Sequence, residues 1–438
     1  MRILHITTHT GGGVGTVILN WVLKDNSSEH TIMLLGYADE KTVELCYANN
    51  IKLYEKASKD YAFICSEIED SDIVVIHYWN HPLLLDFLIN NKLPQCRIIT
   101  WLHTSGLNAP YSLPKQIVEM SDKFVFTSPI SYELDIARIP KYCNKFTDIW
   151  STGGVEKYIN VKHRRHEGFN ILYVGTLDFS KIREDYIFIC SQILKEIPEA
   201  TIILCGNGSS MQEMIGQVND LGLHDRIIFK GHVSDLIPYY EVADCFLYLL
   251  DSNHYGTCEQ VLGEVMSCGI VPIVFNNACE KEIVNNNAIG YIVSTVAECI
   301  SSIKEIYKDT RPDNKNVKIY TTYMKELIQE KYSIDKMIDK WNKLFDEIIL
   351  EDKKEREWQT NFTNIYGLGT IAFLESLDND IAKLFHEYIS YERQIEQLFK
   401  SNLQWHSDSK GSIKQYLKFF PNDKYLNKFQ QIMDEDIL

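Results

Sequence analysis

The sequence predicts an α/β fold in which two Rossmann-like domains face each other and a helical extension follows them. Short apolar runs alternate with amphipathic stretches, the alternation pauses at the polar segment 156–167 and restarts, and the chain turns polar and helical from about residue 295. Continuous apolar runs separated by helices are typical of parallel strands that are covered on both faces. Two such series predict two domains with a ligand cleft between them, at the carboxyl ends of the strands.

The first domain is expected over residues 1–155. Apolar residues recur at helical spacing over Val14–Leu23 and Pro82–Leu88, between the runs that predict strands. The predicted strands are Ile3–Ile6, Thr31–Leu35, Ile73–His77, Ile98–Leu102 and Phe124–Thr127.

Gly12, Gly13 and Gly15 lie in a glycine-rich loop between the first predicted strand and the first predicted helix. Glycine lets backbone N–H groups approach a phosphate at a helix N-terminus. The loop does not match a dinucleotide fingerprint, because Thr16 stands where the last glycine belongs, and no Gly-Lys-Ser/Thr of a P-loop follows. A phosphate contact and a simple tight turn therefore both stay open.

The second domain is expected over residues 156–349. Helical spacing is found over Tyr186–Glu196 and Met211–Leu221, and residues 314–349 predict two further helices. The predicted strands are Asn170–Val174, Ala200–Leu204, Arg226–Phe229, Cys245–Leu250 and Ile270–Phe275.

The last segment, residues 350–438, has no series of strand-like runs and is expected to be a helical appendage. Apolar and aromatic residues recur at helical spacing over Ile381–Phe399 and Ile413–Phe420. This much apolar surface should pack on something, and we expect a small bundle that braces the first domain. A subunit contact in a homodimer and a platform on the acceptor side are the alternatives.

Composition narrows the partners and the compartment. The net charge of -16 disfavours nucleic acids and, on average, anionic membranes. One basic stretch, Lys157 with residues 162–166, is either a solvated linker or a patch for an anion or a lipid headgroup, which leaves a peripheral membrane contact open. The 11 cysteines include no CxxC pair, and no apolar run is long enough to span a membrane, so a cytoplasmic protein with reduced cysteines is expected.

Several segments of the second half resemble group 1 glycosyltransferases, a retaining family with the GT-B fold. The resemblance rests on residues 169–177 followed by Lys181, on residues 205–208 and 229–233, and on residues 263–274, in that order along the chain. It extends more weakly over the first half, where His103 ends an apolar strand, and it covers roughly residues 1–350.

The resemblance implies a metal-independent transfer of a sugar from a nucleotide diphosphate-sugar, with no cofactor and with an acceptor that the sequence does not reveal. A UDP-linked sugar is slightly favoured. Cations aimed at the departing phosphate lower the barrier, so Lys181 and the helix that follows Thr257 and Cys258 are the candidates. The resemblance also implies that Glu264 binds the ribose and that His103 lies near the transferred sugar. The other candidate donor contacts are Gly12, Gly13, Gly15, Gly175 and Val233.

Two positions depart from the family pattern. Thr176 stands where the family commonly has an arginine, and Gly256 stands where it usually has a glutamate, eight residues before Glu264. Glu259 either replaces this glutamate as a catalytic group or is a solvated residue in the first turn of a helix. These departures keep two alternatives open, a non-catalytic homologue that binds nucleotide-sugars and a nucleotide-sugar epimerase.

Overall fold

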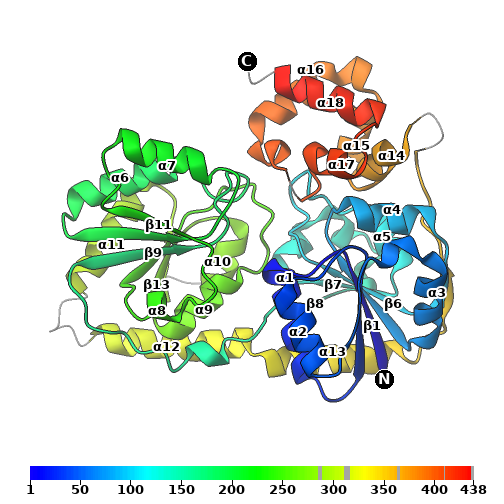
Figure 1. Ribbon diagram of the computed structural model, residues 1–438, viewed down its shortest axis with the longest axis horizontal. Coiled ribbons are helices and arrows are strands. Elements are labelled where there is room, and N and C mark those ends of the chain that lie inside the picture. Colours follow the sequence, from blue (N-terminus) through cyan, green and yellow to red (C-terminus); the bar gives the residue numbers. More distant parts are fainter. Residues whose placement is uncertain (285–288, 310–315, 363–365, 409, 436–438) are drawn as a thin grey trace. The chain divides into compact units, whose positions relative to one another are not determined.

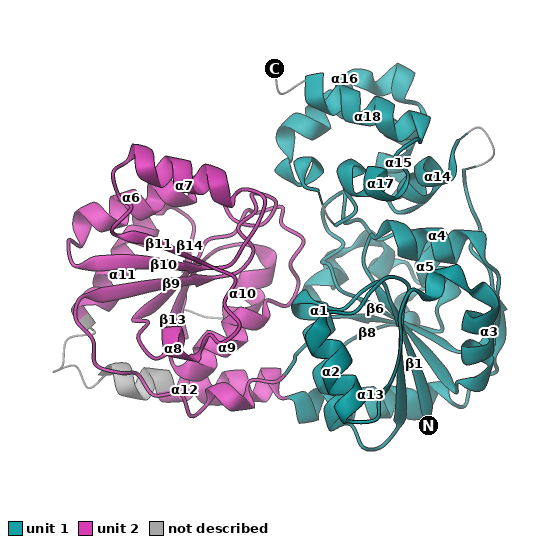
Figure 2. Cartoon of the chain, in the orientation of Figure 1, with its two compact units in different colours: residues 1–153, 334–438 teal, residues 154–333 magenta. Residues whose placement is uncertain are grey.

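The computed structural model describes residues 1–284, 289–309, 316–362, 366–408 and 410–435. The chain forms two compact units, which are treated separately below (Figure 2). Unit 1 comprises residues 1–153 and 334–438, and unit 2 comprises residues 154–333. Residues 334–349, which the sequence analysis grouped with the second domain, therefore belong to the first compact unit.

Unit 1 contains a parallel sheet with the strand order β3-β2-β1-β4-β6-β7-β8 (Figure 1). Its strands are β1 (Arg2–Thr7), β2 (Glu29–Leu34), β3 (Lys52–Tyr54), β4 (Ile73–Tyr78), β6 (Ile98–Leu102), β7 (Lys123–Phe126) and β8 (Phe146–Asp148). The connecting helices are α1 (Gly12–Lys24), α2 (Glu40–Ala48), α3 (Tyr61–Asp70), α4 (Pro82–Asn90) and α5 (Lys115–Met120). The strand order reverses between β1 and β4, and loops at the carboxyl ends of such a sheet commonly bind ligands.

One face of this sheet packs against α1 and α13 (Ile334–Ile348). Trp341 of α13 stacks on Trp21 of α1 with the ring centroids 4.6 Å apart. All seven buried residues of α13 recur every three or four positions, so they share one side of the helix. This spacing explains why α13 covers the first sheet. The seven buried residues are Ile334, Met337, Ile338, Trp341, Leu344, Phe345 and Ile348.

Unit 2 contains a second parallel sheet with the order β11-β10-β9-β12-β13-β14. Its strands are β9 (Phe169–Val174), β10 (Ala200–Cys205), β11 (Ile227–Gly231), β12 (Cys245–Tyr248), β13 (Val271–Phe275) and β14 (Tyr291–Val293). Its helices are α6 (Tyr186–Glu196), α7 (Met211–Asp220), α8 (Ile237–Tyr240), α9 (Gln260–Cys268), α10 (Ala278–Val284), α11 (Val296–Asp309) and α12 (Asn316–Tyr332). The prediction of two parallel α/β sheets followed by a helical extension is confirmed.

The C-terminal segment packs on unit 1 and shares its core. Its helices are α14 (Leu368–Glu375), α15 (Asn379–His386), α16 (Tyr388–Ser401), α17 (Ile413–Phe419) and α18 (Lys424–Glu435). Helices α14 and α17 lie beside α4, and Phe373 and Tyr416 are buried in one cluster with Leu84 of α4 (Figure 1). Asn80 donates a hydrogen bond to the Ser376 carbonyl at 2.6 Å. The expected bundle on the first domain is thus present.

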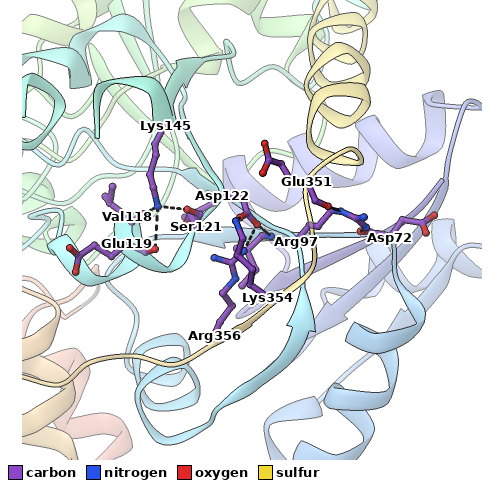
Figure 3. A network of polar contacts seen from close by, with 12 residues as sticks. Asp72, Arg97, Val118, Glu119, Ser121, Asp122, Lys145, Glu351, Lys354 and Arg356 are labelled. Atoms are coloured by element: carbon purple, nitrogen blue, oxygen red, sulfur yellow. Dashed lines mark hydrogen bonds and ion pairs between the residues drawn. The ribbon is translucent and has the colours of Figure 1, made fainter. Parts of the chain in front are cut away.

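A short strand and a buried ion pair attach this segment at its start. Strand β15 (Lys354–Arg356) pairs antiparallel with β5 (Leu93–Cys96). The guanidinium of Arg356 forms an ion pair with Asp122, and both side chains are buried. Arg97 donates a hydrogen bond to the Glu351 carbonyl at 2.6 Å (Figure 3). The backbone around Asp122 is held in turn by Lys145, whose ammonium donates to the carbonyls of Val118, Glu119 and Ser121 (Figure 3).

Two details of the C-terminal prediction are wrong. Residues 354–356 form a strand, although no strand was expected after residue 350. The helix expected over Ile381–Phe399 is divided into α15 and α16, with Glu387 outside helical geometry between them. A three-residue strand carries no period of its own, and an apolar stripe can continue across a break between helices. Among the described residues, no helix combines the length and the apolar character needed to cross a membrane.

Candidate active site

Three loops meet backbone to backbone at the carboxyl ends of β9, β10 and β11 in unit 2. The Gly175 N–H donates to the Cys205 carbonyl at 3.0 Å, and the Gly206 N–H donates to the Gly231 carbonyl at 2.7 Å. A Cβ on Gly206 would lie 1.8 Å from the Gly175 oxygen, so only glycine fits there. Val233, a predicted donor contact, follows in the half-buried loop after β11.

Lys181 lies in a loop whose backbone is fixed to the end of β12. The Asp251 N–H donates to the Lys181 carbonyl at 2.8 Å, and the Arg183 N–H donates to the Leu249 carbonyl at 3.2 Å. The side chain is only 11% exposed, and its ammonium lies 5.7 Å from the centre of the Tyr255 ring. The loop therefore holds one buried cation at the carboxyl edge of the sheet.

Glu259 is the partner of this cation. Its Oε2 lies 2.8 Å from the Lys181 Nζ and also accepts a hydrogen bond from the Tyr248 hydroxyl at 2.5 Å. Glu259 is buried, so the alternative of a solvated residue in the first turn is wrong. Burial raises the pKa of the Glu259 carboxyl, but the charges of Lys181 and His254 and the hydrogen bonds from Lys181 and Tyr248 together outweigh this effect, and the pKa is lowered.

The same pair keeps Lys181 charged. Burial alone would lower the pKa of the Lys181 ammonium, yet the charge of Glu259 raises the pKa well above its ordinary value. The candidate site therefore contains a permanent buried cation whose charge is balanced by one carboxylate.

The Glu259 carboxylate occupies the space beside Gly256. A Cβ on Gly256 would lie 2.1 Å from the Glu259 Oε1 and 2.6 Å from the His254 ring. The Gly256 N–H donates to the His254 Nδ1 at 2.9 Å, and the His254 Nε2 lies 3.0 Å from the Glu280 carboxylate. Burial lowers the pKa of His254, but the charge and hydrogen bond of Glu280 together with the charge of Glu259 outweigh it, and the pKa is raised. The Glu259 carboxylate and the His254 ring therefore fill the space that a Cβ at position 256 would need.

Thr257 and Cys258 precede α9, whose first turn begins just after Glu259. The positive end of the α9 dipole therefore lies next to the Lys181–Glu259 pair in the chain. The Cys258 sulfur lies 3.8 Å from the Tyr332 hydroxyl at the end of α12, within the distance of a weak hydrogen bond to sulfur. Thr257 and Cys258 therefore lie at the N-terminal end of α9, where a negatively charged group would be stabilised.

Glu264 lies within α9 and is held by tyrosines. The Tyr240 hydroxyl donates to the Glu264 Oε2 at 2.8 Å, and Tyr158 also bonds this carboxylate. Burial raises the pKa of the Glu264 carboxyl, which the Tyr240 hydrogen bond and the charge of Lys157 only partly offset. A partly buried carboxylate with fixed orientation suits the predicted ribose contact, and that role stays a prediction.

In unit 1 the glycine loop begins α1 at Gly12, earlier than predicted. Gly11 and Gly12 have φ angles of 110° and 65°, and a Cβ on either of them or on Gly13 would meet open space. A Cβ on Gly15 would lie 3.0 Å from the Thr10 backbone, so Gly15 serves packing. The loop presents an accessible helix N-terminus without an aspartate or glutamate in its first turn.

His103 directly follows β6 and is buried at this carboxyl edge, as predicted from its position. Its Nε2 lies 3.0 Å from the His77 Nδ1. Burial, with a smaller contribution from the charge of Lys410, lowers the pKa of His103 to about 3. Lys410 comes from the C-terminal segment, and its ammonium lies 5.7 Å from the centre of the Trp79 ring.

One group of side chains in the described part of the chain has the spacing of a metal site. The potential ligand atoms of His163, His166 and Asp244 lie within 4.8 Å of one another. Asp244 immediately precedes β12 and His166 precedes β9, so the group lies at the amino ends of the strands. It is therefore at the other end of the sheet from Lys181 and Glu259. Arg164 of the same basic stretch pairs with Glu241 at 2.9 Å, and residues 162–165 are exposed, as expected for a solvated stretch.

Comparison with known proteins places this geometry in a class. The structure is similar to that of HepE of Anabaena, which was solved in complex with UDP. The TM-score is 0.62 at 14% sequence identity, and the match covers 79% of this chain and 100% of HepE. A glycosyltransferase of Rickettsia africae gives a TM-score of 0.63 at 15% identity, covering 80% of this chain and 99% of that one. The chain has the GT-B fold.

The family is identified on the second unit. Residues 155–323 match the family model of the group 1 glycosyl transferases, so this part of the chain is a group 1 glycosyl transferase domain. N-acetyl-alpha-D-glucosaminyl L-malate synthase of Bacillus anthracis is 21% identical over 180 residues. That match spans 40% of this chain and 45% of the synthase. For residues 155–323, the match confirms the group 1 family that the sequence motifs indicated.

Sequence reasoning missed the residues that complete both sites. Tyr248 bonds the predicted Glu259 in unit 2, and His77 bonds His103 in unit 1. His254 accepts from the Gly256 N–H and is itself bonded to Glu280. His77 carried a signal, because a polar residue inside an apolar strand needs a buried partner. Tyr248 and Glu280 gave none, because their contacts depend on how distant segments pack.

Proposed function

We propose that this chain is a retaining glycosyltransferase that moves a sugar from a nucleotide diphosphate-sugar to an acceptor. The observation that carries the proposal is the buried, permanently charged Lys181 beside the start of α9, in a domain of the group 1 family. UDP-linked sugars are the first donors to test, because HepE was solved with UDP-glucose and the synthase relative is named for an N-acetylglucosaminyl group. Retention of configuration is taken from the family resemblance.

The proposed chemistry uses groups of the protein itself. As the bond between sugar and phosphate breaks, negative charge grows on the departing phosphate. The Lys181 ammonium and the positive end of the α9 dipole would stabilise this charge, which is why we propose transfer without a metal. Glu264 would accept hydrogen bonds from the ribose hydroxyls. The eleven free cysteines support a reducing compartment such as the cytoplasm.

A non-catalytic nucleotide-sugar-binding protein is the second candidate. It is favoured by one observation, that Glu259 neutralises Lys181 within 2.8 Å while Gly256 supplies no carboxylate. A phosphate arriving at Lys181 would have to compete with Glu259 for the ammonium. The two candidates differ in turnover and agree in donor binding.

Substitution of Lys181 separates these candidates. Lys181→Ala should lower kcat by about 100-fold or more, as loss of one transition-state donor does, with a smaller effect on the donor KM. The assay is transfer from a panel of UDP-sugars to mixed glycan, lipid and small-molecule acceptors, followed by mass spectrometry. Lys304→Ala, which breaks an exposed Lys–Glu pair in the same unit, is the matched control and should keep activity.

A wild-type protein that raises its melting temperature with UDP-sugars yet transfers nothing in the whole panel is the non-catalytic homologue. A Lys181→Ala variant with unchanged kcat would remove Lys181 from the proposed chemistry.

A further inference from the structure

An unbroken row of buried polar side chains crosses the sheet of unit 1 and ends at His103. The His30 Nε2 lies 3.1 Å from the Asp25 carboxylate, and the His30 Nδ1 lies 2.9 Å from the His5 Nε2. The His5 Nδ1 lies 3.0 Å from the His77 Nε2, and the His77 Nδ1 lies 3.0 Å from the His103 Nε2. We call these five residues the histidine row.

The strand register explains why the imidazoles line up. His30 is level with Ile3, two residues before His5. His5 in turn is level with Val75, two residues before His77, and His77 is level with Trp101, two residues before His103. Since side chains alternate between faces, each step of two keeps the row on one face and moves it toward the carboxyl edge.

The surroundings of the row are apolar. Its side chains lie on the sheet face that α1 and α13 cover, where Trp21 contacts the His5 ring edge-on at 4.9 Å and Trp101 lies 4.8 Å from the His103 ring. His5 and His77 are completely buried, and the other members are at most 9% exposed. Each imidazole therefore depends on its neighbours in the row for hydrogen bonds.

The aspartate fixes the direction of every hydrogen bond. An ionised carboxylate only accepts, so the His30 Nε2 carries the proton and, in a neutral ring, the Nδ1 accepts from the His5 Nε2–H. The same logic repeats at His5 and His77. Each of the four histidines is then protonated at Nε2, and His103 is left with a bare Nδ1 at the carboxyl edge of the sheet. In the part of the chain that the structure describes, no hydrogen bond is formed with this Nδ1.

The charge states agree with this assignment. Burial, together with the neighbouring histidines, holds the pKa of His5 and of His77 well below the ordinary value. Burial raises the pKa of the Asp25 carboxyl, but hydrogen bonds from His30 and Ser27 outweigh it and bring the pKa to about 2. The row thus holds one negative charge at Asp25 and neutral imidazoles at His5, His77 and His103.

We propose that Asp25, acting through His30, His5 and His77, sets the tautomer of His103 so that its Nδ1 accepts a hydrogen bond from a hydroxyl group of the bound sugar or acceptor. Asp25, His30, His5 and His77 are positioning residues, and His103 is the group that meets the substrate. The hydroxyl as the ligand rests on the proposed glycosyltransferase function, whereas the tautomers rest on the row alone.

The tautomers of the wild-type protein test the first half of this proposal. Long-range ¹⁵N–¹H NMR correlations on ¹⁵N-histidine-labelled protein at mildly alkaline pH should show all four imidazoles protonated at Nε2 and bare at Nδ1. A proton on Nδ1 of any of the four would overturn the proposal. This readout needs no activity, so it stands apart from a failure of the proposed function.

Asp25→Asn tests the second half. The Asp25 Oδ1 accepts from the Ser27 N–H at 2.8 Å and from the Ser27 hydroxyl at 2.6 Å, so the amide oxygen of Asn should take this place. The amide N–H then faces His30, and all four tautomers should invert together. His103 would present a donor to the substrate, and kcat/KM should fall by about tenfold or more, while donor binding by unit 2 stays unchanged.

Asp60→Asn, which alters the aspartate that caps the N-terminus of α3 in unit 1, is the control and should change neither the tautomers nor kcat/KM. Inverted tautomers with unchanged kcat/KM would refute the role of the His103 Nδ1. Should Asp25→Asn not fold, the wild-type tautomers still decide on the row.

Discussion

At the scale of single residues, the site in unit 2 depends on the carboxylate of Glu259, which stands three positions after the place of the usual family glutamate. Glu259 bonds Lys181 and Tyr248 and fills the space that a side chain at position 256 would need. The sequence therefore has no glutamate at position 256, and the Glu259 carboxylate lies beside that position in the structure. A motif comparison reports which residue stands at a given sequence position, whereas the chemistry of a site depends on where the charged group lies in three dimensions.

Exchange of the two positions tests this account. Gly256→Glu alone should destabilise the protein by about 1–3 kcal/mol, because its side chain overlaps with Glu259 and adds a second carboxylate beside one lysine. Adding Glu259→Gly to this variant removes the overlap with Glu259 and the second carboxylate, while the overlap with the His254 ring remains, so it should recover part of the stability and the donor affinity. Urea unfolding and calorimetry with UDP measure the two effects. Equal stability of the single and double variants would show that Glu259 does not occupy that space.

The sequence placed His103 correctly at the carboxyl end of a strand, because a residue after an apolar run has a defined place in a parallel sheet, and it placed Glu264 correctly inside a helix. It left open whether Glu259 is buried, and it did not reveal the histidine row. His5, His30 and His77 lie 25 or more residues apart in the sequence. Only the register of neighbouring strands brings them together, and register is not visible in a single strand.

At the scale of elements, the long runs were predictable and the short edge strands were not. The runs that became β1, β4, β6, β9 and β10 are mostly apolar and form strands of five or six residues, whereas β3, β8, β14 and β15 have three residues each. A three-residue strand at an edge is defined by its partner rather than by its own period. Helix α13 was predicted as a helix, but its packing on unit 1 depends on the complementary surface formed by Trp21 and Trp101.

The link between β15 and unit 1 gives a prediction at this scale. Arg356→Ala leaves Asp122 as a buried carboxylate without its guanidinium and should cost about 3–5 kcal/mol of stability. Lys354→Ala removes an exposed charge 3.6 Å from the same aspartate and should cost under about 1 kcal/mol. Chemical denaturation of both variants provides the comparison. Similar losses for the two variants would mean that Arg356 does not anchor the C-terminal segment.

At the scale of the whole molecule, two parallel sheets carry different parts of the proposed chemistry. Unit 2 supplies the buried cation and the start of α9, and unit 1 supplies an accessible glycine loop and the histidine row. The C-terminal helices share a core with unit 1 and bring Lys410 beside Trp79, close enough for its charge to act on His103. This segment is therefore part of the architecture of unit 1 rather than a separate domain.

The central claim is that unit 2 binds the diphosphate of a nucleotide-sugar through Lys181 and the start of α9. A crystal structure of the protein with UDP tests it most directly. We expect a phosphate oxygen within hydrogen-bond distance of the Lys181 Nζ, the other phosphate at the backbone of Thr257 and Cys258, and the ribose hydroxyls on Glu264. A diphosphate bound away from Lys181, with the Lys181–Glu259 pair intact and Glu264 still held only by Tyr240 and Tyr158, would contradict the claim.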